Sequence, residues 1–244
     1  MEYKEHYTND ERRLITSVGP VGSRCDVEIP NDIVELSKGN FRQCENIKKI
    51  IFPNYLLEIN DESFYNCIFL EELIIPKNIR AIGSYAFHNC PYLTKVQFDA
   101  DIKVLKPYTF TKCSRLEEIE IPEGVEKIST GVFEDCENLR KVVLPSSLRK
   151  IENNIFDFCY NLEEVIINAE CKIPKDIFTK TDSNVYEGCN FKVYITEKSF
   201  ELSPEFVEIY KDNIDFIKPK TLDDLLNEGK SFREINKMYA EKEL

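Results

Sequence analysis

Apolar residues recur along this chain with a spacing of 23 residues over most of its length. The clearest marker is a phenylalanine followed three residues later by a cysteine, which occurs six times at constant phase. A fixed period of about 20 to 50 residues is typical of repeat proteins, in which each unit buries its apolar side chains against its neighbours. The pattern therefore predicts a solenoid of stacked coils. The six pairs are Phe41/Cys44, Phe64/Cys67, Phe87/Cys90, Phe110/Cys113, Phe133/Cys136 and Phe156/Cys159.

A short segment after each cysteine alternates between apolar and polar residues. Aligned on the Phe-x-x-Cys motif, the repeat reads C-x-x-L-x-x-I-x-I-P, and the two I positions are rich in β-branched residues. Alternation with period two and β-branched residues favour a strand, and the proline that follows in most copies ends it. A second apolar pair then turns the chain inward again. We expect the Phe-x-x-Cys segment to form a short helical turn on the far side of the coil.

These motifs resemble the BspA-type (Treponema-type) leucine-rich repeat, which is marked by A-F-x-x-C followed by L-x-x-I-x-I-P. The best copy, from Ile79 to Pro91, keeps Ala86, Phe87 and Cys90 of that motif. The resemblance covers about residues 25–196. It implies an α/β leucine-rich repeat solenoid with a parallel sheet on its concave face. Many members of that family are surface proteins that bind other proteins, so the resemblance also implies a protein-binding role.

The chain divides into three parts: an N-terminal segment or cap (1–24), the solenoid (25–196) and a C-terminal helical region (197–244). The first strand copy, Val27 to Pro30, lacks the leading Leu, and Val193 follows Val165 by 28 residues instead of 23. We interpret these two irregular copies as capping strands of a solenoid that ends near Ile195.

The C-terminal region loses the 23-residue period and shows helix signals instead. Ser203-Pro204-Glu205 predicts the start of a helix, and two capping boxes, Thr221/Asp224 and Ser231/Glu234, predict a helical hairpin. The stretch Leu225–Ile235 resembles the opening of a resolvase-type helix-turn-helix, so a DNA-associated regulator is one alternative function. The region holds 12 acidic and 8 basic residues, which is the wrong sign for a phosphate backbone. A cap over the last coil, or a small docking element, is the favoured interpretation.

Side chains that flank the central apolar residue of each strand should point outward on the sheet. One such column alternates in charge from Asp26 to Lys192, and the next column mixes polar residues with Ile, Val and Tyr. Strand register alone explains the alternating charges, because alternation keeps like charges apart across neighbouring strands. Strand propensity alone explains the β-branched residues of the second column. Apolar groups in a polar rim are also typical of partner-binding surfaces. The candidate partner-binding residues are Glu28, Lys49, Ile51, Glu72, Ile74, Lys95, Gln97, Glu118, Glu120, Lys141, Val143, Glu164, Ile166, Lys192 and Tyr194.

The six repeated cysteines predict buried free thiols, because they follow the repeat and not a pairing rule. Cys171 and Cys189 lie outside the ladder and could pair in an oxidising compartment. No metal site is predicted, since the chain has two histidines and no Cys/His pair at ligand spacing. No phosphate-binding loop or catalytic motif occurs either, so we expect no cofactor and no enzyme activity.

The formal net charge of −12 repels polyanions, so nucleic acid is an unexpected partner. Residues 1–15 carry no apolar run of the kind found in signal peptides, so we expect a cytoplasmic protein without membrane insertion. The function expected is a non-catalytic scaffold that presents its concave face to a protein of unknown identity. A surface adhesin or host-protein binder, exported without a recognisable signal, is the second alternative. The sequence leaves the oligomeric state open.

Overall fold

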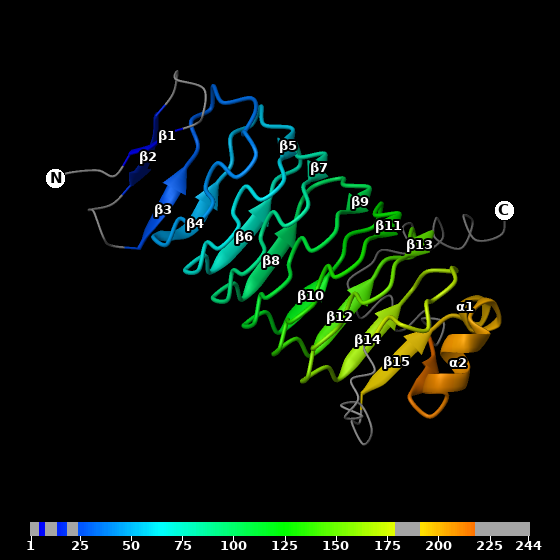
Figure 1. Cartoon of the computed structure of the whole chain (residues 1–244). Coiled ribbons are helices and arrows are strands. Elements are labelled where there is room, and N and C mark those ends of the chain that lie inside the picture. The colour runs from blue at the N-terminus through cyan, green and yellow to red at the C-terminus, as the bar shows by residue number, and fades with distance from the viewer. Residues whose placement is uncertain (1–4, 8–13, 19–23, 179–190, 218–244) are drawn as a thin grey trace, which may run out of the picture.

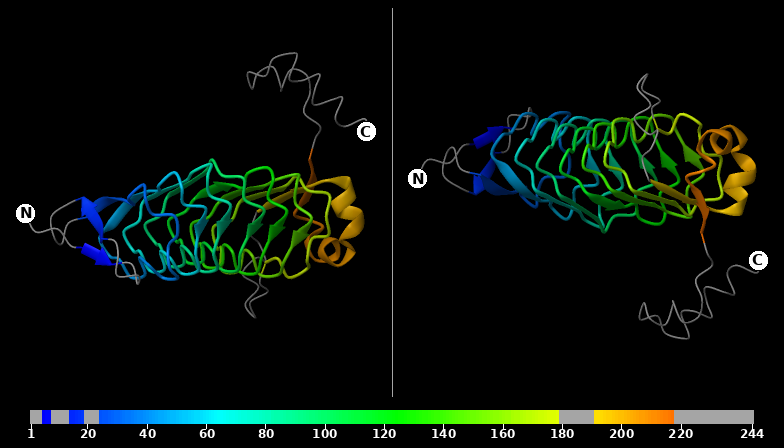
Figure 2. Two further views of the ribbon diagram at one scale, coloured as in Figure 1. Left: turned by 90° about the horizontal axis from the view of Figure 1, so that it is seen from above. Right: turned by 90° about the horizontal axis from the view of Figure 1, so that it is seen from below.

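The computed structural model describes residues 5–7, 14–18, 24–178 and 191–217, and these form a solenoid of stacked coils (Figure 1). Each coil contributes one longer strand to one side and, in the central coils, a two-residue strand to another side. All pairings between coils are parallel, as the repeat predicts. Figure 2 shows the coils following one another along a single axis, with the helices at the C-terminal end.

The longer strands begin with an N-terminal hairpin and run to a last strand after the two helices. β1 pairs antiparallel with β2, and β2 pairs antiparallel with β3, which starts the parallel series. The longer strands fall into two hydrogen-bonded groups, β1-β2-β3-β4-β6-β8 and β10-β12-β14-β15-β16. They are β1 Glu5–Tyr7, β2 Leu14–Val18, β3 Cys25–Glu28, β4 Ile47–Ile51, β6 Glu72–Ile75, β8 Lys95–Phe98, β10 Glu118–Glu120, β12 Lys141–Leu144, β14 Glu164–Ile167, β15 Lys192–Ile195 and β16 Ile214–Phe216.

A second parallel sheet consists of two-residue strands in the order β13-β11-β9-β7-β5. Its inward residue in each coil is a buried Ile or Leu from the second apolar pair of the repeat. The short length follows from the repeat, because turns begin within a few residues on both sides. The strands are β5 Glu58–Ile59, β7 Ala81–Ile82, β9 Val104–Leu105, β11 Lys127–Ile128 and β13 Lys150–Ile151.

The Phe-x-x-Cys segments form consecutive turns, so the expectation of a short helical turn is wrong. In each repeat the residues two before and two after the phenylalanine have positive φ, as at Tyr85 (56°) and Asn89 (55°) around Phe87. A helix requires negative φ throughout, so these two residues exclude it. The turns instead hydrogen-bond to the next coil: the N–H groups of Phe87 and Asn89 donate to the carbonyls of Thr109 and Thr111 at 3.0 and 2.8 Å.

The phenylalanines form one continuous stack in the core. Neighbouring rings from Phe41 to Phe156 have centroids 5.0–6.1 Å apart and lie within 10° of parallel. Phe178 extends the stack beyond the sixth repeat, with its ring 5.6 Å from that of Phe156. Each large ring is fully buried. The interior is therefore continuous from coil to coil, as expected for a solenoid.

The repeated cysteines are buried thiols that bond to the coil before them. The Sγ atoms of Cys67, Cys90, Cys113, Cys136 and Cys159 each donate to the carbonyl of the phenylalanine 26 residues earlier, at 3.1–3.5 Å. A small residue with a weak donor fills this corner and gives the carbonyl a second hydrogen bond, since in most coils the carbonyl already accepts from the cysteine N–H of its own turn, as Phe41 does from Cys44 at 3.1 Å. The pairing of Cys171 with Cys189 falls outside the described residues.

Two short helices and one more strand close the C-terminal end. Helix α1 (Glu197–Leu202) is capped by Thr196, whose side chain accepts from the Ser199 N–H at 3.1 Å. Helix α2 (Pro204–Tyr210) starts where Ser203-Pro204-Glu205 predicts a helix, which confirms that prediction. β16 then pairs in parallel with β15, so the sheet continues beyond the capping strand expected at residues 193–195. The two capping boxes at Thr221 and Ser231 lie outside the described residues.

Candidate functional site

The side chains predicted for partner contact lie on one surface, formed by β3, β4, β6, β8, β10, β12, β14 and β15. We call this surface the long-strand face. Backbone pairing puts Glu72 beside both Lys49 and Lys95, and Val143 beside both Glu120 and Ile166. The columns read from the sequence are therefore paired neighbours, except across β8 and β10 and, for Ile51 and Ile74, across β4 and β6.

None of the fifteen predicted residues is buried. Ile51 is the most open of the apolar ones, with 46% of its surface exposed. Ile74, Val143, Ile166 and Tyr194 are half-buried, because neighbouring side chains cover part of each. The structure thus places two apolar groups on this face, one on β4 and β6 and one on β12, β14 and β15. The exposed members are Glu28, Ile51, Glu72, Lys95, Gln97, Glu118, Glu120 and Lys192; the half-buried ones are Lys49, Ile74, Lys141, Val143, Glu164, Ile166 and Tyr194.

The alternating charge column forms ion pairs at some of its steps. Lys49 lies 3.7 Å from Glu72, and Lys141 lies 2.8 Å from Glu164. The hydrogen bond to Glu164 raises the pKa of the Lys141 ammonium. Pairs this exposed contribute only about 0–1 kcal/mol each. The column is therefore mainly a means of keeping like charges apart and of fixing register.

A second column, one residue earlier and charged in five repeats, escaped the sequence analysis: it reads Lys48, Glu71, Thr94, Glu117, Arg140 and Glu163. Lys48 pairs with Glu71 at 3.3 Å, and Arg140 makes a two-point contact with Glu163 at 2.9 Å. That contact lowers the pKa of the Glu163 carboxyl and raises the pKa of the Arg140 guanidinium. The same 23-residue period was the available signal, since these residues directly precede the first column. This column widens the charged border of the long-strand face.

The long-strand sheet is interrupted between β8 and β10. Backbone pairing joins β6 to β8 and β10 to β12, but in the described residues no ladder joins β8 to β10. On the other sides of the same coils the stacking continues, with Ile82 paired to Leu105 and the Phe87 and Phe110 rings 5.6 Å apart. The interruption is therefore a local opening of one face.

The bulk of Phe98 explains this opening. Phe98 occupies the inward strand position that Ile75, Ile121 and Leu144 fill in other coils, and its ring meets the Phe110 ring edge-on at 6.1 Å. A larger side chain at one layer of a tightly packed core pushes its neighbours apart. The other phenylalanine at this position, Phe52, has a similar effect, because pairing between β4 and β6 is reduced to Lys49 with Glu72.

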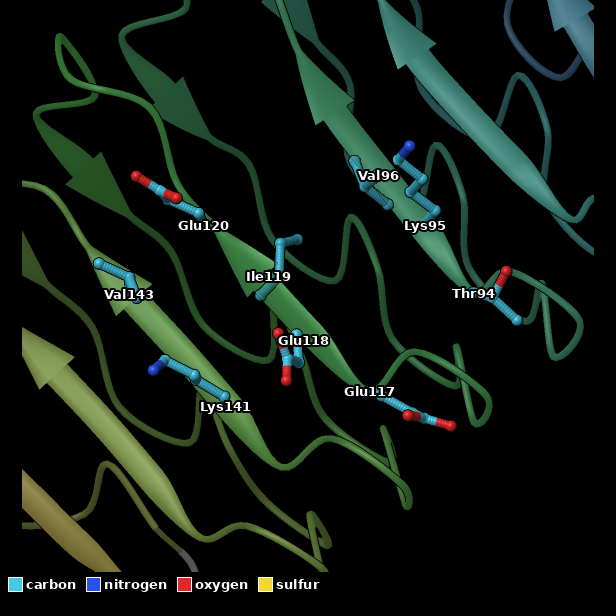
Figure 3. Close-up of a pocket in the computed structure, with 9 residues that line it drawn as sticks. All are labelled: Thr94, Lys95, Val96, Glu117, Glu118, Ile119, Glu120, Lys141 and Val143. Carbon is cyan, nitrogen blue, oxygen red and sulfur yellow. The ribbon is translucent and has the colours of Figure 1, made fainter. Parts of the chain in front are cut away.

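A shallow pocket of about 470 Å³ occupies the opening. Its floor is apolar: Figure 3 shows Val96 and Ile119 between the β8 and β10 ribbons. Val96 is half-buried, whereas Leu73, Ile119 and Val142 at the same position of other coils are buried. Carboxylates from one strand border the pocket, together with lysines from the neighbouring strands. The charged lining residues are Lys95, Glu117, Glu118, Glu120 and Lys141.

Comparison with protein families matches this architecture to the BspA type leucine rich repeat region. The match has six copies and spans residues 23–114 and 80–207, which together cover most of the chain. The chain belongs to this family. The leucine-rich repeat solenoid and its parallel sheets, expected from the repeat, are thereby confirmed. A search of curated proteins finds no match.

Solved structures of other leucine-rich repeat proteins are similar in part. A Treponema pallidum leucine-rich repeat protein is 25% identical, with a TM-score of 0.48 and coverage of 78% of each chain. A leucine-rich repeat protein from Eubacterium ventriosum is 23% identical, with a TM-score of 0.48, 80% of this chain and 44% of that one. A leucine-rich cell surface protein from Faecalibacterium prausnitzii is 20% identical, with a TM-score of 0.46, 64% of this chain and 53% of that one.

The described part of this BspA-type solenoid also contains acidic side chains and thiols away from the long-strand face. Within its ranges no group of three or more His, Cys, Asp or Glu side chains could hold a metal ion. Burial raises the pKa of the Cys113 thiol to about 12, and burial also raises the pKa values of Cys67, Cys90 and Cys136, so these thiols stay protonated near neutral pH. No described helix has both the length and the apolar character that a membrane crossing needs. The long-strand face remains the candidate site.

Proposed function

We infer that this protein is a non-catalytic binding module that presents its long-strand face to a protein partner. The observation that carries the proposal is the coincidence, on one face, of half-buried apolar residues with two charged columns and a pocket. Apolar areas with a charged or polar border are the usual composition of a protein interface, and this face has two of them. The face is built on paired strands, so its side chains lose little freedom when a partner binds.

The proposed contact is tested with one double variant on this face. Ile74→Glu with Ile166→Glu places a charge in each apolar group, while both side chains already reach solvent and the fold should remain intact. The matched control is Val104→Glu, a half-buried β-branched residue at the outward position of short strand β9. Each tagged protein is used for affinity capture from the native host, and captured proteins are identified by mass spectrometry.

The expected result is at least one protein captured by the wild type and by Val104→Glu but lost with the double variant. Its direct binding is then measured with the purified pair, where the double variant should weaken affinity by at least ~10-fold, because each buried charge costs more than about 1 kcal/mol. If purified partners bind the double variant as tightly as the wild type, the long-strand face is not the contact surface. Thermal unfolding of all variants checks that the loss is not misfolding.

A further inference from the structure

The opening between β8 and β10 is the place where two neighbouring coils of the described long-strand face share no strand ladder. In a regular coil, the backbone of the long strand pairs with the long strands of the coils before and after it. The facing backbone edges of β8 (Lys95–Phe98) and β10 (Glu118–Glu120) share no such ladder in the described structure. These backbone groups lie beside the half-buried Val96 at a solvent-open pocket, where water, or a partner that displaces it, can take the place of the missing strand. This location therefore offers a partner side chain both a hollow and backbone groups that no neighbouring strand pairs.

The width of the opening limits what can enter. Some Cα atoms of β8 and β10 lie within 8 Å of each other. A further strand between them would require a separation of roughly 9.6 Å, which is twice the spacing of paired strands. An added strand is therefore excluded, whereas a single extended side chain fits a pocket of about 470 Å³. The occupant enters from the face and does not continue the sheet.

The lining of the opening carries three glutamates against two lysines, Lys95 and Lys141, and this acidic excess favours a cationic side chain with an apolar stem. Val96 and Ile119 provide an apolar floor, and Glu117, Glu118 and Glu120 provide three carboxylates at its edge. In the described structure none of these three glutamates has an oxygen within 4.0 Å of a Lys or Arg nitrogen. Lys141, the nearest lysine on β12, is held by Glu164 at 2.8 Å on its far side. Long cationic side chains bury their methylene stems on apolar surface and keep the charged head at its border.

We propose that the β8–β10 opening is a subsite for an arginine side chain of the protein partner. The arginine stem lies over Val96 and Ile119, and its guanidinium donates to the carboxylates of Glu118 and Glu120. Arginine fits better than lysine, because its planar head can bond two acceptors at once and is less strongly hydrated. This proposal rests on the proposed function and assigns the chemistry of one position within it.

The test uses a blocked tripeptide, acetyl-Gly-Arg-Gly-amide, titrated into full-length protein with labelled Ile and Val methyl groups. We expect NMR shifts that saturate in the millimolar range at the methyls of Val96 and Ile119. The same peptide with glutamate should give none, and the norleucine peptide, which keeps the stem without the charge, should give clearly weaker shifts. Raising the salt to about 0.5 M should weaken the arginine response.

Two variants distinguish the contribution of the glutamate charges from the contribution of the pocket volume. Glu118→Gln with Glu120→Gln keeps the pocket and should weaken peptide binding by at least ~5-fold, because a charge-assisted contact is lost. Phe98→Ile keeps the charges and should abolish the methyl shifts by letting β8 and β10 close. An arginine peptide that leaves Val96 and Ile119 unmoved, or binds the glutamine variant equally well, overturns the subsite.

The two proposals fail separately. A purified partner that is lost with the Ile74→Glu and Ile166→Glu double variant, yet binds Glu118→Gln with Glu120→Gln as tightly as wild type, leaves the proposed function standing and removes the subsite. The opposite outcome is also possible to distinguish. If the arginine peptide gives saturating NMR shifts but no partner loses binding with the Ile74→Glu and Ile166→Glu double variant, the subsite stands and the proposed contact surface is wrong.

Discussion

At the scale of single residues, burial keeps five of the ladder cysteines in the thiol form: Cys67, Cys90, Cys113, Cys136 and Cys159. Cys113 donates to the Phe87 carbonyl at 3.4 Å, and burial raises the pKa of its thiol to about 12, from an ordinary value of 9.0. Ionisation would place a charge in the core and break this hydrogen bond. The ladder therefore stabilises the fold only while its thiols are protonated.

This coupling predicts a loss of stability at alkaline pH. The native pKa values are raised, so folded protein retains protons that unfolded protein releases above about pH 9. Stabilisation by the thiols is full below pH 9 and is lost as pH rises toward 12, by ~1.4 kcal/mol per pH unit for each linked thiol. Urea unfolding between pH 7 and 10.5 measures the trend, with Cys113→Ala as the control. A slope that is the same for Cys113→Ala and wild type would contradict the linkage.

Gly83 lies too close to the backbone of the preceding coil to carry a side chain, so its replacement should lower the free energy of unfolding. A Cβ atom at Gly83 would lie 2.3 Å from the backbone nitrogen of Asp61 in the preceding coil. Backbone cannot move aside as a side chain can, so Gly83→Ala should destabilise by ~2–4 kcal/mol. Gly39→Ala is the matched control: its nearest contact is Arg42 at 3.7 Å, and its positive φ of 67° costs only ~1–2 kcal/mol. Thermal and urea unfolding compare the two, and a smaller loss for Gly83→Ala would be inconsistent with this packing.

At the scale of strands and turns, the sequence predicts what depends on periodicity. Alternation with period two placed Lys49 beside Glu72 and Val143 beside Ile166, and the observed register confirms both. The turns were missed because their positive-φ positions are mostly filled by residues such as Tyr85 and Lys112, which give no glycine signal. Hydrogen bonds to the next coil hold the backbone of these turns in the positive-φ conformation. Such bonds between coils cannot be read from the local sequence.

The interruption of the sheet could not be predicted from the pattern of apolar and polar residues, because that pattern treats Phe98 and Ile75 as equivalent. Their difference is volume, and its effect depends on the spacing between coils, which only the structure supplies. Once that spacing is known, a phenylalanine at the inward strand position indicates a weakened pair, as both Phe52 and Phe98 show. The pocket on the candidate site follows from this one position.

Replacement of Phe98 by isoleucine should therefore restore the missing strand pair. With the smaller side chain, β8 and β10 can form a ladder like that of β6 with β8, and amide exchange in Glu118–Glu120 should slow by at least ~10-fold. Hydrogen exchange followed by mass spectrometry measures this change. Phe52→Ile is the matched control, since it should protect β4 and β6 while leaving β10 unaffected. Unchanged exchange in β10 of Phe98→Ile would show that side-chain bulk is not the cause of the opening.

At the scale of the whole molecule, the solenoid has three sets of connections between coils: the long strands, the short strands and turns, and the phenylalanine stack. Between β8 and β10 the first set is missing, and the short-strand pair there is reduced to Ile82 with Leu105. In a stacked-repeat protein, stability is a sum of coil terms and nearest-neighbour terms. This junction therefore depends more than others on the contact of Phe87 with Phe110.

Removing a ring at this junction should divide the solenoid into two unfolding units. Phe110→Ala leaves a core cavity and costs ~3–5 kcal/mol, as does Phe133→Ala, whose coil is fully paired on both sides through β12. The two variants should differ in cooperativity. Phe110→Ala should unfold with a lower m-value, and exchange should show coils before β8 and after β10 opening at different urea concentrations, whereas Phe133→Ala should retain a single transition. A single transition for both variants would mean that the hydrogen bonds between the Phe-x-x-Cys turns are enough to couple the two halves. The interrupted sheet would then change the surface of the molecule without weakening its folding cooperativity.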